Sequence, residues 1–335
     1  MKKTSLAIFL ILSIFFFANK AISIIIADKD KQLFEEMSAN PQNNMQQKAI
    51  PINVVIMTID PKVELGKKLF FDPILSKTGK ISCASCHRPD HGFADDKSTS
   101  EGINGQQGDR NTPTVFNTVN LKFLFWDGRA QSLEEQALGP IKNPKEMGET
   151  VKGVLAKLNK DPQYVKEFSQ VFGQTPISTS QLVHAIADYE RTIISKDSDY
   201  DKYIAGNKKA LPDSAKRGMD LFFDEAMCVA FHKGSDFTDG DVHNIGLPIT
   251  DDVGRSAISI TGKDTRKFKT PTLREVANTA PYFHKGQFET LEAVIAFYNA
   301  GGGQDDYKDP LKKPLNLNDQ EQKDLVEFLK SLSGR

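Results

Sequence analysis

The feature that most constrains the fold of this chain is an internal repeat. Each copy of the repeat precedes a Cys/His motif. Residues 66–72 read Gly-Lys-Lys-Leu-Phe-Phe-Asp, and residues 218–224 read Gly-Met-Asp-Leu-Phe-Phe-Asp. The two copies begin 152 residues apart, which is the length of one ordinary domain. Self-similarity of this kind predicts repeated structural units. We therefore expect the 335 residues to fold around two related centres.

The first copy is followed by Cys83-x-x-Cys86-His87, the spacing that attaches c-type haem. Residues i and i+3 share one face of a helical turn, so both sulfurs can reach the two vinyl groups of one haem, and His87 can bind the iron. A zinc half-site and a redox dithiol are the alternative interpretations. Zinc would need two further ligands at similar spacing, but the chain has only three Cys in all. The first motif therefore predicts covalently bound haem.

The second copy is followed by an incomplete motif, Cys228-x-x-Phe231-His232. Phe231 stands where the second Cys belongs, whereas Cys228 and His232 remain. A haem here would be held by one thioether and His232, or be bound without a covalent bond, or be absent. With no cofactor, Cys228 is a buried thiol and His232 a core histidine. The repeated segment before the motif favours a second haem.

The first 27 residues differ in composition from the rest. Lys2 and Lys3 precede an apolar run at residues 6–17, followed by small residues, a pattern typical of a cleaved secretory signal peptide. An uncleaved membrane anchor is the alternative, although the run is shorter than the roughly 20 residues that a span needs. Residues 28–60 are predicted to form an extension or linker. Export to the periplasm agrees with c-type haem, which is attached outside the cytoplasm.

Charge and periodicity indicate the class of fold. The chain carries 43 Lys and Arg against 44 Asp and Glu, so no basic excess points to nucleic acid. Strand-like alternation is scarce, and polar loops cover residues 90–112 and 236–270. Apolar residues at i, i+3 and i+4 predict helices at residues 151–159, 163–172, 179–194, 291–298 and 319–332. We predict an all-α fold of two helical domains with long irregular loops, residues 61–205 and 206–335.

Ordered motifs support a more specific identification. They lie at residues 65–72, 82–87, 108–114, 125–130, 132–136, 143–147, 268–274 and 279–286. From residue 61 to the end, the chain resembles the bacterial di-haem cytochrome c peroxidase family, including its MauG-type branch. The resemblance implies two cytochrome-c-like helical domains, each with a haem c, and a calcium ion between them. It also implies reduction of hydrogen peroxide to water, with electrons from a small cytochrome c or copper protein, and it suggests a homodimer.

The same resemblance implies three catalytic residues. By position, Glu146 resembles the acid/base residue beside the peroxide, and Gln136 resembles a pocket neighbour that hydrogen-bonds to it. Splitting the O–O bond requires a proton to leave one oxygen and reach the other, and desolvation raises the pKa of a carboxyl group toward neutrality. Trp126, the only Trp, resembles the aromatic bridge between the haems. Without the resemblance, Glu146 would be interpreted as a solvated acid and Trp126 as core packing.

The resemblance also implies which residues bind the calcium ion between the two domains. Asn111 resembles a side-chain ligand of the calcium ion, and the backbone carbonyls of Thr279 and Pro281 resemble its partners. Oxygen-only ligation with few carboxylates suits a hard cation that keeps some water. His243 and His284 fall in family motifs and are expected to make structural or haem-propionate contacts.

Two positions depart from the classical peroxidases of this family. Ile103 stands where those enzymes supply a distal His, so we expect a first haem that is five-coordinate at rest; His91 is the nearest alternative ligand. Tyr298 stands where they supply Met, and as an iron ligand it would lower the haem potential; the alternative interpretation is that it packs on the apolar face of its helix. These departures favour a MauG-like oxidase that modifies a partner protein as an alternative function. Phe231 favours a single-haem carrier or sensor.

Overall fold

The computed structural model describes residues 23–24, 56–57, 60–248 and 251–334. The chain divides into two units, residues 1–60 and residues 61–335. Of the predicted signal peptide and linker, only Asp60 and the paired antiparallel strands β1 (Ser23–Ile24) and β2 (Ile56–Met57) are described, so these two predictions otherwise lie outside the described residues. None of the described helices has the length and apolar character needed to cross a membrane.

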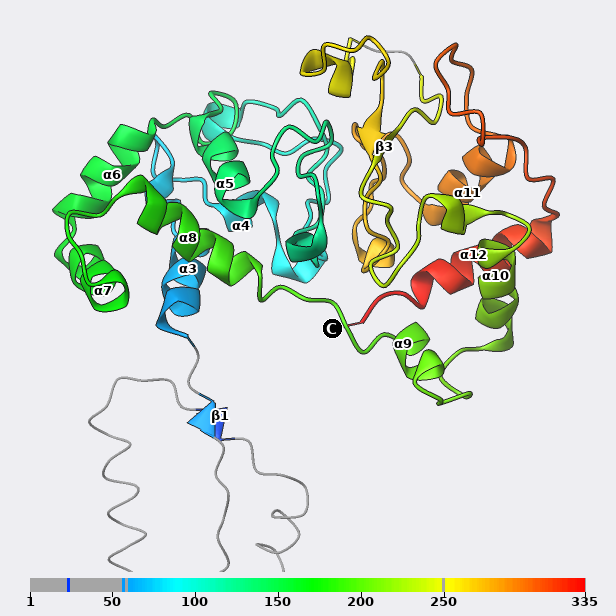
Figure 1. Cartoon of the computed structure of the whole chain (residues 1–335), viewed down its shortest axis with the longest axis horizontal. Helices are drawn as coiled ribbons and strands as arrows, with labels where there is room; N and C mark the ends of the chain where they lie inside the picture. Colours follow the sequence, from blue (N-terminus) through cyan, green and yellow to red (C-terminus); the bar gives the residue numbers. More distant parts are fainter. Residues whose placement is uncertain (1–22, 25–55, 58–59, 249–250, 335) are drawn as a thin grey trace, which may run out of the picture. The chain divides into compact units, whose positions relative to one another are not determined.

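The second unit is rich in helices (Figure 1). Its α-helices are α3 (Pro61–Phe71), α4 (Cys83–Cys86), α5 (Leu133–Lys142), α6 (Val151–Lys160), α7 (Pro162–Phe172), α8 (Thr179–Glu190), α9 (Asp199–Ile204), α10 (Asp213–Phe223), α11 (Leu291–Asn299) and α12 (Asp319–Lys330). Its 3-10 turns are η1 (Pro73–Leu75), η2 (Pro89–His91), η3 (Ile103–Gly105), η4 (Thr118–Asn120), η5 (Cys228–Ala230), η6 (Arg255–Ala257) and η7 (Val276–Asn278). Strands β3 (Val242–His243) and β4 (Phe268–Lys269) form one short antiparallel pair.

All five helices predicted from apolar spacing are present, and their ends differ by a few residues. The largest difference is at α8, which ends at Glu190 rather than at residue 194. There the hydroxyl of Thr192 donates to the carbonyl oxygen of Tyr189, and Ile193 N–H bonds back to Glu190, so the chain closes in a tight turn. Ile193 remains buried, because it packs in a small core beside α3 rather than along α8.

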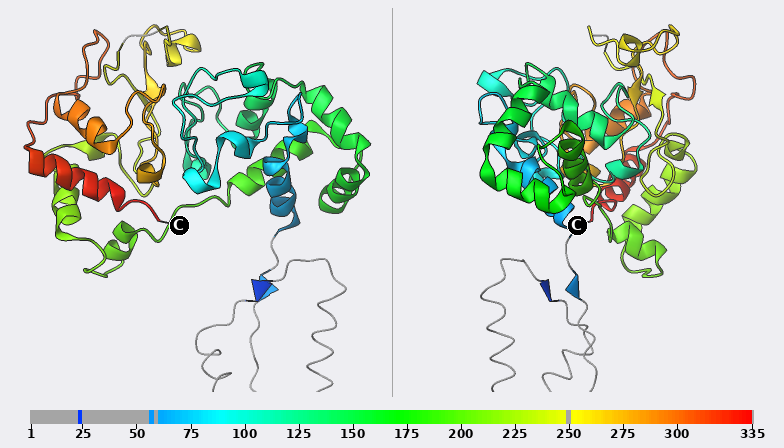
Figure 2. Two further views of the ribbon diagram at one scale, coloured as in Figure 1. Left: turned by 180° about the vertical axis from the view of Figure 1, so that it is seen from behind. Right: turned by 60° about the vertical axis from the view of Figure 1, so that its left-hand side comes forward.

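The sequence repeat corresponds to two equivalent helix pairs. Helix α3 carries the first copy and packs on α8, and α10 carries the second copy and packs on α12 (Figure 2). A Cβ atom at Gly66 would overlap the backbone carbonyl oxygen of Ala185, and one at Gly218 would overlap that of Asp324. The repeated glycine therefore permits each pair of helix backbones to approach closely.

Each helix pair belongs to a hydrophobic core of its own. The first core includes Leu69, Leu158 and Phe168, all fully buried, and the second is built around Phe222 and Phe328. Two cores agree with the expectation of two similar halves, and the boundary between residues 205 and 206 stays a prediction. Long irregular loops connect the helices in both halves, as the sequence indicated.

Candidate functional site

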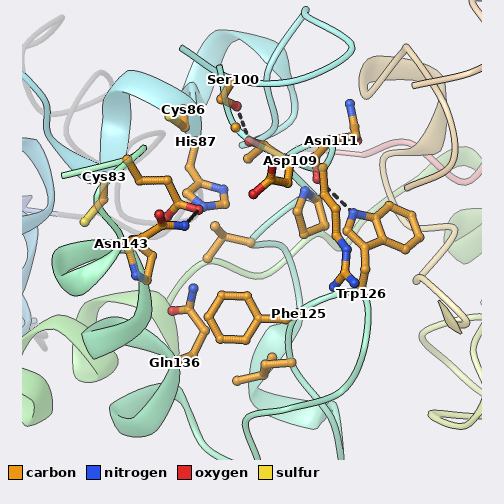
Figure 3. A pocket seen from close by; sticks show the side chains of 18 of the residues that line it. Cys83, Cys86, His87, Ser100, Asp109, Asn111, Phe125, Trp126, Gln136 and Asn143 are labelled. Atoms are coloured by element: carbon orange, nitrogen blue, oxygen red, sulfur yellow. Dashed lines mark hydrogen bonds between the residues drawn. The ribbon is translucent and has the colours of Figure 1, made fainter. Parts of the chain in front are cut away.

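A cavity of about 700 Å³ in the second unit is lined mainly by residues between Ile81 and Glu190, and Asp251, Asp252 and Lys285 of the second half also line it. Cys83, Cys86 and His87 line one side, and Gln136 and Phe125 line the opposite side (Figure 3). Cofactor sites in proteins typically measure about 300–1,000 Å³. The cavity therefore joins the first Cys/His motif and the predicted catalytic side chains in a space of the size that a cofactor requires.

The short helix α4 sets the geometry of the motif. A reciprocal hydrogen-bonded cap between Ser82 and Ser85 starts the turn, and the N–H of His87 closes it on the carbonyl of Cys83. Neither Cys83 nor Cys86 is in a disulfide. Burial raises the pKa of both thiols, that of Cys86 to about 11. Two protonated thiols on one turn are thus available for thioether bonds.

The imidazole of His87 is oriented for a metal. Its Nδ1 donates to the carbonyl oxygen of Phe93 at 3.2 Å, which leaves Nε2 as the lone-pair nitrogen. Metal-binding histidines are commonly held in this way by a carbonyl behind the ring. Burial lowers the pKa of His87, which keeps the ring neutral. Together with the free thiols and the cavity, this arrangement fits a covalently bound haem with His87 as iron ligand.

Glu146 reaches the cavity through the turn that ends α5. Asn143 caps that helix, and the backbone N–H of Glu146 returns to the carbonyl of Asn143. The amide Nδ2 of Asn143 donates to Oε1 of Glu146 at 2.7 Å. Burial raises the pKa of Glu146, while the charge of Arg129 and the Asn143 hydrogen bond oppose this rise. The result is a carboxyl group that is held in place and shifted toward protonation.

A second acidic side chain of the cavity, Glu190, was missed by the reasoning from sequence. It lines the cavity from the last turn of α8 and is only 6% exposed. Burial raises its pKa to about 8. A signal was available, because Glu190 follows Ile186 by four residues and so continues the apolar face of the helix.

Neither Ile103, at the distal position, nor His91, the alternative ligand, lines the cavity. Ile103 is buried, and its backbone N–H donates to the carbonyl of Glu146, so its loop supports that residue from behind. His91 turns away and donates from Nε2 to the carbonyl of Ala280 at 2.8 Å. Among the described residues that line the cavity, His87 is the only histidine. The five-coordinate resting state stays a prediction, and this geometry is compatible with it.

Trp126 lies where the two halves of the unit meet. It is 9% exposed, and its Nε1 donates to the carbonyl of Asn111 at 2.8 Å. Its own carbonyl accepts from the N–H of Lys269 in β4 at 2.7 Å. The Trp126 ring meets the ring of His284 edge-on, with centroids 6.4 Å apart. The indole therefore contacts residues of both halves.

His284 and the predicted calcium ligands lie beside this contact. The N–H of Asn111 donates to the carbonyl of His284 at 2.8 Å, which brings Asn111 next to the segment that contains Thr279 and Pro281. Within the described residues, Oδ1 of Asn111 and the carbonyl oxygens of Thr279 and Pro281 accept no hydrogen bond. These three oxygens are of the kind that would bind a hard cation such as calcium. His284 stacks on Phe268, and burial lowers its pKa to about 4.

The second motif keeps the arrangement of the first around its histidine. His232 donates from Nδ1 to the carbonyl of Phe237 at 2.9 Å, as His87 does to Phe93. Phe93 and Phe237 share a left-handed backbone, with φ of 52° and 51°. Cys228 is a free thiol whose pKa burial raises to about 11. Cys228 and His232 are the residues that would hold a second haem, by one thioether and one histidine.

Near the second motif, the rings of Phe231 and Tyr298 both contact Lys312. Lys312 was not among the residues predicted from the sequence. Phe231 is 5% exposed, and the Nζ of Lys312 lies 3.7 Å from the centre of its ring and 4.8 Å from that of Tyr298. Burial raises the pKa of the Tyr298 phenol and lowers that of Lys312 to about 8. The 700 Å³ cavity is not lined by any of these three residues.

The family model, the relatives and the solved structure that this chain matches all indicate the same protein family. Residues 60–209 match the family model described as di-haem cytochrome c peroxidase. The chain is 38% identical over 278 residues to the methylamine utilization protein MauG of Methylophilus methylotrophus, covering 82% of each chain. It is 41% identical over 283 residues to the cytochrome c551 peroxidase of Pseudomonas aeruginosa, covering 81% of this chain and 78% of that one. A crystal structure of a MauG-like protein associated with microbial copper homeostasis aligns with a TM-score of 0.78 at 32% identity, covering 83% of this chain and 90% of that chain.

Proposed function

Because the chain belongs to the di-haem cytochrome c peroxidase family, we propose that it reduces hydrogen peroxide to water with electrons from a small periplasmic cytochrome c or copper protein. Each turnover consumes one peroxide, two electrons and two protons and releases two waters. The observation that supports this most directly is the single cavity that is lined by Cys83, Cys86, His87 and Glu146. A haem-attachment motif and a carboxyl group able to transfer protons therefore line the same cavity.

The role of the first haem follows from the residues that would hold it. Bound through Cys83, Cys86 and His87, haem would supply the iron that binds peroxide and passes electrons to it. The Phe93 carbonyl accepts from Nδ1 of His87, which would leave Nε2 for the iron and would make the ring a better donor. No histidine lines the opposite wall among the described residues, so the peroxide position is left open.

Glu146 is the proposed proton carrier. Its carboxylate would take a proton from one oxygen of the peroxide and deliver it to the other, which would leave as water. Asn143 fixes Oε1 by donating to it, so Oε2 is the oxygen that exchanges the proton. The buried setting that raises the pKa of Glu146 makes the group a stronger base for this step than an exposed carboxylate. Gln136, which also lines the cavity, would orient peroxide by hydrogen bonding.

The remaining parts of the proposal concern electron supply. Residues 61–205 would be the peroxidatic domain and residues 206–335 the electron-transfer domain, with a second haem bound by Cys228 and His232 and with Tyr298 as a predicted iron ligand. Trp126 would bridge the haems, and calcium at Asn111, Thr279 and Pro281 would stabilise the contact between the halves. Export by residues 1–27 would place the protein in the periplasm, and the protein would form a homodimer.

A MauG-like oxidase is the second candidate function. Ile103 and Tyr298 favour it, because a first haem without a distal histidine and a second haem with a phenol ligand suit oxidising chemistry shared between two haems. Such an enzyme would use peroxide to oxidise residues of a partner protein. An oxidised, quinone-type product on a co-purified partner would identify this function.

Two measurements test the peroxidase proposal. Peroxide consumption is followed with a reduced small cytochrome or copper protein as donor, and the expected result is two donor molecules oxidised for each peroxide. Intact mass under denaturing conditions is measured beside total extractable haem. Two haems per chain with donor oxidation support the proposal. One haem per chain without donor oxidation would indicate a single-haem carrier or sensor instead.

A further inference from the structure

Glu190 is a buried acid that faces the cavity without a partner. It is 6% exposed and lines the cavity of the first Cys/His motif from the last turn of α8. Within the described residues, its carboxyl oxygens make no hydrogen bond and no ion pair. A buried carboxylate is costly unless it is paired. The group therefore either stays neutral or has its charge balanced by the occupant of the cavity.

The charged side chains nearest to Glu190 are paired with one another. Arg191 donates to Oε1 of Glu134 in α5 at 2.5 Å and to Oδ1 of Asp188 at 2.8 Å. Burial raises the pKa of Glu190 to about 8, with the charge of Arg191 opposing the rise and that of Glu134 adding to it. No cation on α5 or α8 is thus left to pair with Glu190 within the described residues.

The other ionisable groups around Glu190 come from α3 and α4. The thiol of Cys83 lines the same cavity, and burial together with the charge of Glu190 raises its pKa. Attachment of haem would convert this thiol into a thioether, which binds no proton. From α3, Glu64 acts on Tyr189, where burial and then the charges of Glu190 and Glu64 raise the pKa of the phenol. Beside the attachment site, Glu190 therefore remains able to titrate after haem is bound.

The internal repeat relates α8 to α12 residue by residue. A Cβ atom at Gly66 would overlap the carbonyl oxygen of Ala185, and one at Gly218 would overlap that of Asp324. Because Gly66 and Gly218 are the same position of the repeat, Ala185 and Asp324 are equivalent as well.

This relation shows that the fold does not require an acid at position 190. Counting five residues onward from each contact, Glu190 of α8 is equivalent to Leu329 of α12, which is 5% exposed and belongs to the second core. The preceding residues, Tyr189 and Phe328, pack on the equivalent phenylalanines of α3 and α10, with ring centroids 5.2 and 5.0 Å apart. Leucine satisfies the packing in the second half, whereas the first half places a carboxyl group against the cavity.

We propose that Glu190 is the proton-binding group of the first haem: its carboxyl takes up one proton when the haem is reduced and releases it when the haem is oxidised. This inference rests on the proposed function, in which haem occupies the cavity and the donor protein supplies the electron. Each electron adds one negative charge to the cavity, and one proton from solvent cancels it on the carboxylate. The exchange is favoured because an unbalanced charge is costly in a buried site. Glu190 would thus store one of the two protons that the reduction of peroxide consumes.

The experiment measures the reduction potential of each haem in the full haem-loaded chain at a series of pH values, by redox titration followed in the visible spectrum. Glu190→Gln keeps the shape of the side chain but binds no proton. Glu190→Leu installs the residue that the second half uses at the equivalent position. Asp188→Asn is the matched control, since it removes the same charge from α8 at a residue that does not line the cavity.

The potential of one haem in the wild type should fall by about 59 mV for each pH unit around neutral pH, the one-electron equivalent of a tenfold change in proton concentration. Both Glu190 variants should lose this slope, and Asp188→Asn should retain it. Infrared difference spectra of reduced against oxidised protein give a second readout. The carbonyl band of a protonated carboxyl group should appear on reduction in the wild type and in Asp188→Asn, and in neither Glu190 variant.

A wild-type potential that does not depend on pH would overturn the proposal, as would a slope and a carboxyl band that survive in the Glu190 variants. A potential that is displaced by the same amount at every pH would also overturn it, because Glu190 would then act only as a fixed charge. Covalent haem and donor-driven peroxide reduction with an unchanged slope in the variants refute the role of Glu190 alone. A chain that binds no haem at Cys83 and Cys86 refutes the proposed function as well.

Discussion

Replacing Gly66 with Ala is expected to destabilise the first half of the chain. The new Cβ would overlap the carbonyl oxygen of Ala185 and would lie 2.7 Å from its carbonyl carbon and 2.9 Å from Cβ of Tyr189. All three atoms belong to helix α8 near its backbone and cannot rotate away, so α3 and α8 must separate. Overpacking costs roughly 1–3 kcal/mol, and a clash with a rigid backbone belongs at the upper end of that range.

Alanine also favours the helix, and this gain offsets part of the cost. The higher helix propensity of Ala over Gly contributes about 1 kcal/mol, so the net loss is about 2 kcal/mol. With an unfolding entropy of about 2.1 cal/mol/K per residue over 335 residues, a loss of about 2 kcal/mol lowers Tm by about 3 °C. Gly218→Ala should act in the same way on the second half, since its Cβ would overlap the carbonyl oxygen of Asp324 in α12.

The assay is thermal unfolding of the haem-loaded protein followed by circular dichroism, with Gly153→Ala as the control. At Gly153, in α6, the atom nearest to a new Cβ is a terminal carboxylate oxygen of Glu149, which can move. The control should therefore melt within about 2 °C of the wild type or above it. If Gly66→Ala melts as high as Gly153→Ala, close approach of the backbones is not the reason for the repeated glycine.

Four further outcomes are expected. Glu146→Gln should lower kcat for peroxide by about 10²–10⁴, and Glu135→Gln, an exposed acid of α5, should not; equal losses would exclude a proton role. Glu190 has a folded pKa of about 8, above its ordinary value of 4.5, so its contribution to stability is complete below pH 4.5 and is lost as pH rises to 8. The stability of Glu190→Gln relative to the wild type, measured by chemical denaturation, should therefore rise across this interval; a constant difference would contradict it. Asn111→Ala should abolish the effect of calcium chelators on Tm, and a chelator effect that survives would place the ion elsewhere. Phe231→Cys should shift the alkaline pyridine spectrum of the haem to shorter wavelength at constant haem content, because a second vinyl group becomes saturated; an unchanged spectrum would mean that the new thiol does not reach the haem.

Local spacing was enough to predict five of the helices and to locate the two Cys/His motifs. Cys83 and Cys86 share a turn because any helix places i and i+3 on one face, and His87 follows on the same turn. The repeated glycines mark α3 and α10, since a short motif that recurs before each Cys/His motif implies a recurring packing requirement. These features depend on residues within a few positions of one another, so the sequence by itself determines them.

Only the tertiary structure decided which distant side chains meet. The chain is folded so that α8 carries Glu190 to the cavity more than a hundred residues after His87, and the turn at Asp309 carries Lys312 to Phe231. Nothing near Lys312 in the sequence distinguishes it from the exposed Lys313 beside it. The physical reason is that burial and pairing of a charge depend on the packing of several elements at once, whereas a helical turn depends only on its own residues.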